Sequence, residues 1–197
     1  MRTVGILLFD EVEVLDFAGP FEVFSLVENG EDAAHFKVVT IAEWQAPITA
    51  KNGLTVIPSH DIHNHPPLDV LVIPGGHGAK YIEINNPVVI EWITQQTQEV
   101  ELVLSVCTGA FLLAETGLLN GRTVTTHWRE LEHLAEKYPA IEVIEHDRFI
   151  DASDDALNIV TSAGISAGIA ASLYCVQKLI DRPTMLRVAK RMEFATS

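Results

Sequence analysis

The stretch that decides the fold is residues 102–119, which read LVLSVCTGAFLLAETGLL. Its first five residues are mainly apolar and include β-branched valines, as in a buried strand, and after Cys107-Thr108-Gly109 the apolar residues recur at helical spacing. A buried strand that runs straight into a helix leaves one residue at a sharp turn, and here that residue is Cys107. We expect its side chain at the carboxyl edge of the sheet, where the N–H groups of the first helical turn favour a thiolate. Cys107 is either a nucleophile or, like most free cysteines, a small buried apolar side chain.

Strand and helix patterns alternate along the rest of the chain. Runs typical of strands are residues 3–9, 35–42, 69–73, 122–126 and 157–161, with shorter candidates at 54–57 and within 141–150. Patterns typical of helices follow Gly19-Pro20, Asn86-Pro87, Cys107 and Trp128, and a long one covers 164–180. The first helix is expected to begin at Gly19-Pro20, and the core to take Phe17, Phe21 and Phe24. Continuous apolar strands predict an α/β fold, with a mostly parallel sheet covered on both faces, in one domain over residues 1–197.

The composition limits which binding partners and which cellular compartment are expected. The 197 residues carry a formal net charge of −14, which argues against nucleic acid and anionic membranes as partners. The two cysteines, Cys107 and Cys175, form no disulfide framework and suit a reducing compartment, with Cys175 expected to be inert in the core. No apolar run approaches the ~20 residues of a membrane span, and the first strand is too short for a signal peptide. We therefore expect a soluble, cytoplasmic protein whose partner is a small molecule.

Polar residues follow four of the predicted strands. Open parallel sheets bind ligands outside the carboxyl ends of their strands, so these residues are expected to converge. They are Asp16, Gly75-Gly76, Cys107-Thr108 and His127. Each has a structural alternative: Asp16 could cap the helix at Pro20, the glycines could form a plain turn, and His127 could be a core histidine. Their convergence is stronger evidence for a site than any one of them.

Three other patterns resemble known motifs but do not predict a site. Residues 164–168 match G-x-S-x-G, but in the hydrolases with that motif the histidine follows the serine, whereas the last histidine here is His146. We expect these small residues instead to let a helix approach the sheet. The histidine-rich loop, with His60, Asp61, His63 and His65, has irregular spacing, so no metal site is predicted. The sequence GGHGAK lacks the spacing of a phosphate loop, and no cofactor motif is present.

The same segments resemble the ThiJ/PfpI superfamily. The resemblance rests on residues 7–24, 70–78, 104–119, 123–128 and 161–168, which read LLFDEVEVLDFAGPFEVF, VLVIPGGHG, LSVCTGAFLLAETGLL, TVTTHW and TSAGISAG. These segments extend over nearly the whole chain and occur in the same order as in the superfamily. The resemblance implies a single class I glutamine amidotransferase-like domain with a flavodoxin-like three-layer sandwich, a cysteine at a nucleophile elbow, and a homodimer.

Two branches of the superfamily are most similar: the isocyanide hydratases, and the ligand-sensing domains that precede AraC-type DNA-binding domains. Both carry LD-x-x-GP, here Leu15 to Pro20, together with SVCTG and TTHW. Thr108 stands where the protease branch has a histidine, which argues against peptidase activity. Asp16 stands where the deglycase-like branch has a glutamate, which favours the hydratases. No helix-turn-helix segment follows residue 194, so we expect no binding to DNA.

The resemblance implies an enzyme that hydrates isocyanides. Cys107 would attack the terminal carbon to give a thioimidate, and Asp16, with a pKa raised by burial, would move the protons. Thr108 would hydrogen-bond through its hydroxyl, and N–H groups at Gly76, beside Gly75, and at Thr108 would steady negative charge. His127 would orient water or pack near the sulfur.

Two other functional classes stay open. One is a small-molecule or oxidant sensor in which a low-pKa Cys107 is oxidised. The other is a different cysteine-dependent enzyme, such as an amidase, another hydrolase or a glyoxalase. Phe17, Tyr81 and Trp128 are candidates for the pocket wall in each case.

Overall fold

A seven-stranded sheet forms the centre of the molecule. The computed structural model describes residues 1–29, 33–145 and 148–195. The strand order is β12-β13-β9-β8-β1-β4-β7. The strands are β1 (Arg2–Leu7), β4 (Phe36–Ala42), β7 (His60–Asp61), β8 (Val70–Ile73), β9 (Leu102–Val106), β12 (Phe149–Asp151) and β13 (Asn158–Ser162). All pairs in this sheet are parallel except β12 with β13, which confirms the predicted mostly parallel sheet.

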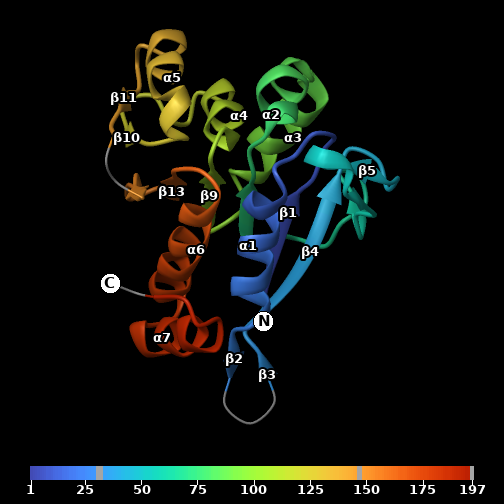
Figure 1. Cartoon of the computed structure of the whole chain (residues 1–197), viewed down its shortest axis with the longest axis vertical. Helices are drawn as coiled ribbons and strands as arrows, with labels where there is room; N and C mark the ends of the chain where they lie inside the picture. The colour runs from blue at the N-terminus through green and yellow to red at the C-terminus, as the bar shows by residue number, and fades with distance from the viewer. Residues whose placement is uncertain (30–32, 146–147, 196–197) are drawn as a thin grey trace.

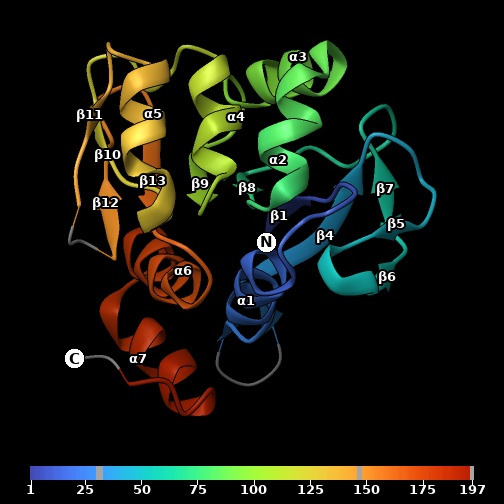
Figure 2. The ribbon, with the colours of Figure 1, turned by 45° about the horizontal axis from the view of Figure 1, so that its top comes forward.

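Helices cover both faces of the sheet (Figure 1). On one face lie α1 (Val14–Ser25) and α6 (Ser166–Leu179), which contact each other, with α7 (Arg182–Arg191) packed on α6. On the other lie α2 (His77–Tyr81), α3 (Pro87–Gln96), α4 (Gly109–Glu115) and α5 (Leu131–Lys137). Figure 2 shows the sheet between these two helical layers. The arrangement is the flavodoxin-like three-layer sandwich that the sequence predicts.

The smaller elements lie in the connections. They are the strands β2 (Glu28–Asn29), β3 (Ala33–Ala34), β5 (Ile48–Thr49), β6 (Thr55–Val56), β10 (Thr123–Val124) and β11 (Glu142–Val143), and the 3₁₀ helices Lys51–Gly53, Glu83–Asn85 and Trp128–Glu130. The predicted short strand at 54–57 is β6, and the two predicted within 141–150 are β11 and β12. His146 lies outside the described residues. No helix among the described residues is long and apolar enough to cross a membrane.

The central strands are buried along their whole length. Every residue of β8 and β9 is buried, because helices cover both faces of the sheet at these strands. Gly168 explains how closely α6 packs: a Cβ there would lie 2.7 Å from the side chain of Val106. Gly109 likewise lets α4 pack closely on the sheet, since a Cβ there would lie 2.1 Å from the carbonyl oxygen of Ile73. Gly168, the last residue of the G-x-S-x-G segment, therefore lets the helix approach the sheet, as predicted.

The first helix begins earlier than the sequence predicts. It starts at Val14, and Pro20 lies inside it. The reason is tertiary, because the N–H of Glu13 donates to the carbonyl of Gly75 at 2.9 Å and holds the chain in position for the helix to begin. Pro20 removes the N–H that would have bonded to the carbonyl four residues earlier, and the helix nevertheless continues to Ser25. Asp16 consequently lies in the first turn and does not cap a later helix; Phe17 and Phe24 are buried as predicted, but Phe21 is exposed.

The predicted strand at 122–126 is mostly wrong. Only Thr123–Val124 is a strand, and it pairs with β11 in a separate two-stranded sheet. The reason is that the threonines bond to the main sheet differently: the N–H of Thr125 donates to the hydroxyl of Thr161 at 3.0 Å, and the hydroxyl of Thr126 donates to the carbonyl of Cys107 at 2.7 Å. These contacts bring the segment that leads to His127 close to the end of β9.

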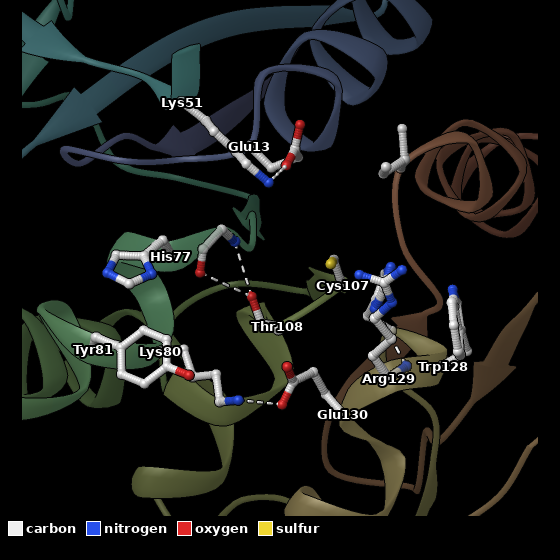
Figure 3. Close-up of a pocket in the computed structure, with 13 residues that line it drawn as sticks. Glu13, Lys51, His77, Lys80, Tyr81, Cys107, Thr108, Trp128, Arg129 and Glu130 are labelled. Carbon is white, nitrogen blue, oxygen red and sulfur yellow. Dashed lines mark hydrogen bonds and ion pairs between the residues drawn. The ribbon is translucent and has the colours of Figure 1, made fainter. Parts of the chain in front are cut away.

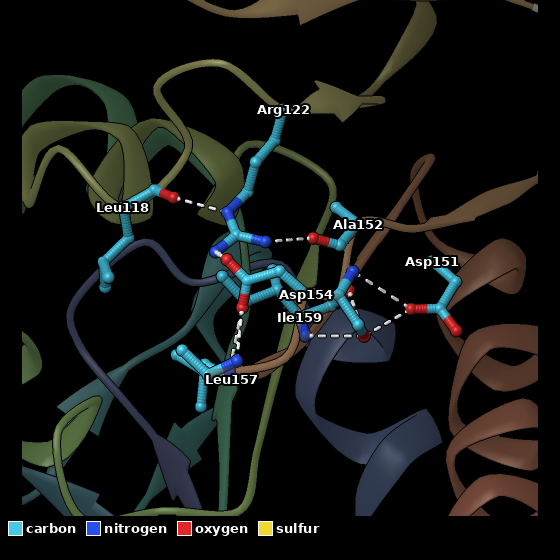
Figure 4. Close-up of polar contacts among 9 residues, drawn as sticks. Leu118, Arg122, Asp151, Ala152, Asp154, Leu157 and Ile159 are labelled. Atoms are coloured by element: carbon cyan, nitrogen blue, oxygen red, sulfur yellow. Dashed lines mark hydrogen bonds and ion pairs between the residues drawn. The ribbon is translucent and has the colours of Figure 1, made fainter.

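Arg122 attaches the start of this segment to the connection between β12 and β13 (Figure 4). Its guanidinium donates to the carbonyls of Leu118 at 2.9 Å and Ala152 at 2.5 Å, and it pairs with the carboxylate of Asp154. One side chain thus joins the connection between α4 and β10 to the connection between β12 and β13.

Candidate active site

Cys107 occupies a strained turn between β9 and α4. Its φ is +56°, a conformation that side-chain-bearing residues rarely adopt. The turn is held by its own backbone, because its N–H donates to the carbonyl of Ser162 at 3.1 Å and its carbonyl accepts from Thr126. The residue is 6% exposed. The sulfur is therefore presented at the carboxyl edge of the central strand, where the sequence predicts it.

Asp16 is the fully buried partner of Cys107. Its carboxylate accepts hydrogen bonds from the backbone N–H of Ile165 at 3.0 Å and of Gly75 at 3.3 Å, and it also bonds to the thiol of Cys107. Burial raises the pKa of Asp16 to about 6, although these donors hold it below the value that burial alone would give. The direction agrees with the expectation from the sequence. Asp16 thus joins α1, the loop after β8 and the start of α6 at one point.

The neutral thiol is the favoured form of Cys107. Burial raises its pKa, and the negative charge of Asp16 raises it further. The N–H and hydroxyl of Thr108 oppose this shift, so the donors expected at the start of the helix are present. Their effect is smaller than that of burial and of the neighbouring carboxylate. The expectation of a low-pKa thiolate is therefore wrong for the resting site, where the raised pKa favours the protonated sulfur.

The two glycines after β8 contribute to the site through their backbone N–H groups. Gly76 has a φ of +132°, and a Cβ there would lie 2.4 Å from the carbonyl oxygen of Glu11, so only glycine fits. The Gly76 N–H donates to the hydroxyl of Thr108 at 2.8 Å, and the Gly75 N–H donates to Asp16. Both N–H groups are thus engaged within the protein. Of the two donors predicted for developing negative charge, the Thr108 N–H is the one directed at the sulfur.

His127 lies beside the thiol and is not a core histidine. It is half-buried, and Gly164 makes room for it, because a Cβ at Gly164 would lie 2.3 Å from the His127 ring and 3.3 Å from the sulfur of Cys107. Its Nδ1 accepts from the N–H of Arg129 at 3.3 Å, which assigns the ring proton to Nε2. Burial lowers the pKa of His127. It is therefore a neutral imidazole that can donate through Nε2.

A cleft of about 450 Å³ opens over Cys107 (Figure 3). It brings together the predicted residues Gly76, Cys107, Thr108 and His127, together with Tyr81 and Trp128. Phe17 is buried and does not line it. Its other lining residues were not predicted: Glu13, Lys51, His77, Lys80, Arg129, Glu130 and Ile165. Glu13, Arg129 and Glu130 adjoin predicted site residues in sequence, which is a usable signal, whereas nothing in the sequence around Lys51 points to the cleft.

Ile165 contributes through its backbone. It has a φ of +58° and a ψ of −105°, which is unfavourable for a β-branched residue. This conformation aims its N–H at Asp16. A side-chain pattern cannot reveal such a role.

The other candidates from the sequence have structural roles. His65 accepts a hydrogen bond from the indole of Trp92 at 3.0 Å, and His60 bonds to the carbonyl of Asn64 at 3.2 Å. Among the described residues no group of three or more His, Cys, Asp or Glu side chains could hold a metal ion. Cys175 is fully buried in α6, and burial raises the pKa of its thiol, as expected of a core cysteine.

The fold and this turn together define a class: doubly wound α/β proteins that present a cysteine at a strained strand-to-helix turn, next to a buried carboxyl group. The model of the DJ-1/PfpI family matches residues 2–178. The chain belongs to the DJ-1/PfpI family, which confirms the resemblance to ThiJ/PfpI proteins.

Individual relatives show how far the similarity extends. Isonitrile hydratase of Pseudomonas putida is 32% identical over 192 residues, which cover 98% of this chain and 78% of that protein. The HTH-type transcriptional regulator GbdR of Pseudomonas aeruginosa is 25% identical over 79% of this chain and 43% of the regulator. A ThiJ/PfpI family protein of Pseudomonas syringae superposes with a TM-score of 0.85 at 26% identity, over 100% of this chain and 76% of that one. Drosophila melanogaster DJ-1beta, at 18% identity over 99% of each chain and a TM-score of 0.82, is similar in fold alone.

Proposed function

We propose that this chain hydrates isocyanides to N-substituted formamides, with Cys107 as the nucleophile and Asp16 as the group that carries protons. The observation that carries the proposal is the hydrogen bond between the thiol and a fully buried carboxyl group, below an open cleft. The terminal carbon of an isocyanide must gain one nucleophile and one proton, and this pair supplies both. The isonitrile hydratase among the relatives supports the same chemistry.

In the first half of the reaction, the sulfur of Cys107 bonds to the terminal carbon of R–N≡C. The thiol proton passes to Asp16 and from there to the same carbon, which gives the thioimidate R–N=CH–S–Cys. No group leaves in this step. Because the resting site holds a neutral thiol, the proton is already in place when the substrate binds.

In the second half, water adds to the thioimidate carbon. Asp16, as carboxylate, takes a proton from the water and delivers it to the nitrogen; the C–S bond then breaks, the last proton returns to the sulfur and R–NH–CHO leaves. The pKa of Asp16, raised to about 6, suits a group that must both accept and release a proton near neutral pH. Neutral His127 orients the water through its Nε2–H, and the hydroxyl and N–H of Thr108 stabilise charge on the sulfur.

A second candidate function is a sensor without turnover. The observation in its favour is the match to transcriptional regulators, of which this chain covers less than half. In this reading the cleft binds a small molecule, or Cys107 responds to an oxidant. The resemblance to the superfamily also implies a homodimer, and light scattering of the purified chain tests that expectation under either function.

The test is to mix the purified chain with 4-nitrophenyl isocyanide and to follow formation of the formamide by ultraviolet absorbance. We expect turnover by the wild type and its loss in Cys107→Ala and Asp16→Asn. The Cys175→Ala variant is the matched control, because it removes a thiol that does not reach the cleft, and it should keep its activity. Absence of turnover with several isocyanides would overturn the hydratase and favour the sensor or another cysteine-dependent enzyme. Turnover that survives in Asp16→Asn would overturn the proton role.

A further inference from the structure

Two of the three cations that line the cleft already have a carboxylate partner. The ammonium group of Lys51 lies 3.0 Å from the carboxylate of Glu13, and Lys80 pairs with Glu130. Figure 3 shows these two ion pairs on opposite sides of the cleft. Because each pair is close to neutral, neither leaves a full positive charge for a ligand.

Arg129 is the third cation, and the described part of the chain provides no carboxylate partner for it. Its guanidinium lies over the ring of Trp128, 4.8 Å from the ring centre. Both residues are exposed and line the cleft, and Figure 3 shows them on the same side of it. Stacking on an aromatic ring limits the positions of the planar group and leaves the N–H groups on its edge available.

We infer that the cleft selects isocyanides whose organic group carries a carboxylate, and that Arg129 binds this carboxylate. A guanidinium offers two parallel N–H donors that match the two oxygens of a carboxylate. One unpaired cation balances one negative charge, which fits a carboxylate better than a phosphate dianion. The identity of the reacting group rests on the proposed function, whereas the anionic end of the ligand rests on Arg129.

The shape and charge of the surroundings support the same ligand. Trp128 and Tyr81 give the cleft two aromatic side chains, which suit a flat group between the reacting carbon and the carboxylate. The chain as a whole has a net charge of −14, so an anion is not drawn to it by the overall field. A local cation is then needed to bind an anionic substrate, and without Arg129 the lining cations that remain are the paired lysines.

The first experiment needs no turnover. Cys107 is alkylated with iodoacetate and, separately, with iodoacetamide, and the two rates are compared as a ratio in each variant. The reagents differ in charge and little in size, and peptide mass spectrometry separates the labelling of Cys107 from that of Cys175. We expect Arg129→Gln to lower the iodoacetate-to-iodoacetamide ratio about threefold, as loss of one unit charge several ångströms away in water predicts. Arg182→Gln, at an exposed position on α7 away from the cleft, changes the net charge equally and should leave the ratio unchanged.

The second experiment measures turnover of 4-isocyanobenzoate and of its neutral methyl ester. We expect kcat/KM of the wild type to favour the carboxylate, and Arg129→Gln to remove that preference mainly through KM. An alkylation ratio that is the same in Arg129→Gln and wild type, or that falls equally in Arg182→Gln, overturns the inference. If the ratio falls as expected but no isocyanide is turned over, the proposed hydratase fails while the anion site at Arg129 stands.

Discussion

Replacing Asp16 by asparagine should change how the stability of the fold depends on pH. The side chain is fully buried, and burial raises its pKa from 3.8 to about 6. The unfolded chain, where the carboxyl group is in water, keeps the ordinary pKa. A difference of roughly 2 pH units at 1.36 kcal/mol for each unit gives about 3 kcal/mol, by which ionised Asp16 lowers the free energy of unfolding at neutral pH.

The direction of the effect follows from the raised pKa. Below about pH 4 the carboxyl group is protonated in both states, and its contribution to stability is fully present. This contribution is lost as the pH rises from about 4 through about 6, because the unfolded chain releases the proton first. The Asp16→Asn variant has no such proton. Its free energy of unfolding, relative to wild type, should therefore increase by about 2 kcal/mol between about pH 4.5 and about pH 7.5.

Urea denaturation of both proteins at several pH values measures this difference. An asparagine amide also places an N–H₂ group against one of the backbone N–H donors, which lowers the stability of the variant by an amount that does not change with pH. The slope with pH, not the absolute difference, is therefore the test. Glu22→Gln, on the exposed face of α1, is the control and should stay within about 0.5 kcal/mol of wild type throughout. A stability difference between Asp16→Asn and wild type that is flat over this range would refute the reasoning.

Three further outcomes are expected. Gly168→Ala should lower the free energy of unfolding by about 1–2 kcal/mol in chemical denaturation, because the new Cβ lies 2.7 Å from the stiff side chain of Val106; unchanged stability would show that α6 can move away from the sheet. Arg122→Gln should lower it by about 1–3 kcal/mol, since three acceptors in two connections lose their shared donor, and a midpoint equal to wild type would contradict that role. Alkylation of Cys107 by iodoacetamide at about pH 8 should be faster in Asp16→Asn by about threefold or more, because burial and the Asp16 charge both raise the pKa of the thiol and the variant removes the charge; a slower reaction would show that the loss of proton transfer to Asp16 outweighs the lower pKa of the thiol.

The order of strands and helices was predictable because it follows from apolar periodicity, which depends on neighbouring residues. The turn at Cys107 was predictable for the same reason, since β9 and α4 adjoin it in sequence. The convergence of Asp16, Cys107 and His127 followed from the rule for parallel sheets. For His127 the predicted position was right, but the predicted reason was wrong. The segment before it is not a strand of the main sheet and is attached to it by hydrogen bonds of threonines.

Features that depend on tertiary contacts were not predictable. Pro20 is typical of the start of a helix, yet the helix begins at Val14, because the hydrogen bond from the Glu13 N–H to the Gly75 carbonyl positions the chain there. Ile165 acts through a backbone N–H, which every residue except proline possesses, so its identity carries no signal. The raised pKa of the Cys107 thiol depends on burial, which outweighs the helix start that the sequence does show.

The way Asp16 is held bears on how this site can persist while the sequence around it diverges. Its two anchors, at Gly75 and Ile165, are peptide amides, and the turn that presents Cys107 is likewise held through its own main-chain N–H and carbonyl. Every residue type except proline supplies such an amide, although at Gly75 a Cβ would lie 2.5 Å from the backbone nitrogen of Thr108, so that anchor requires glycine. Lineages can therefore exchange the side chains that line the cleft, and with them the molecule that is recognised, without disturbing the carboxyl–thiol pair. Over evolutionary time such a scaffold separates the inheritance of reactivity from the inheritance of specificity.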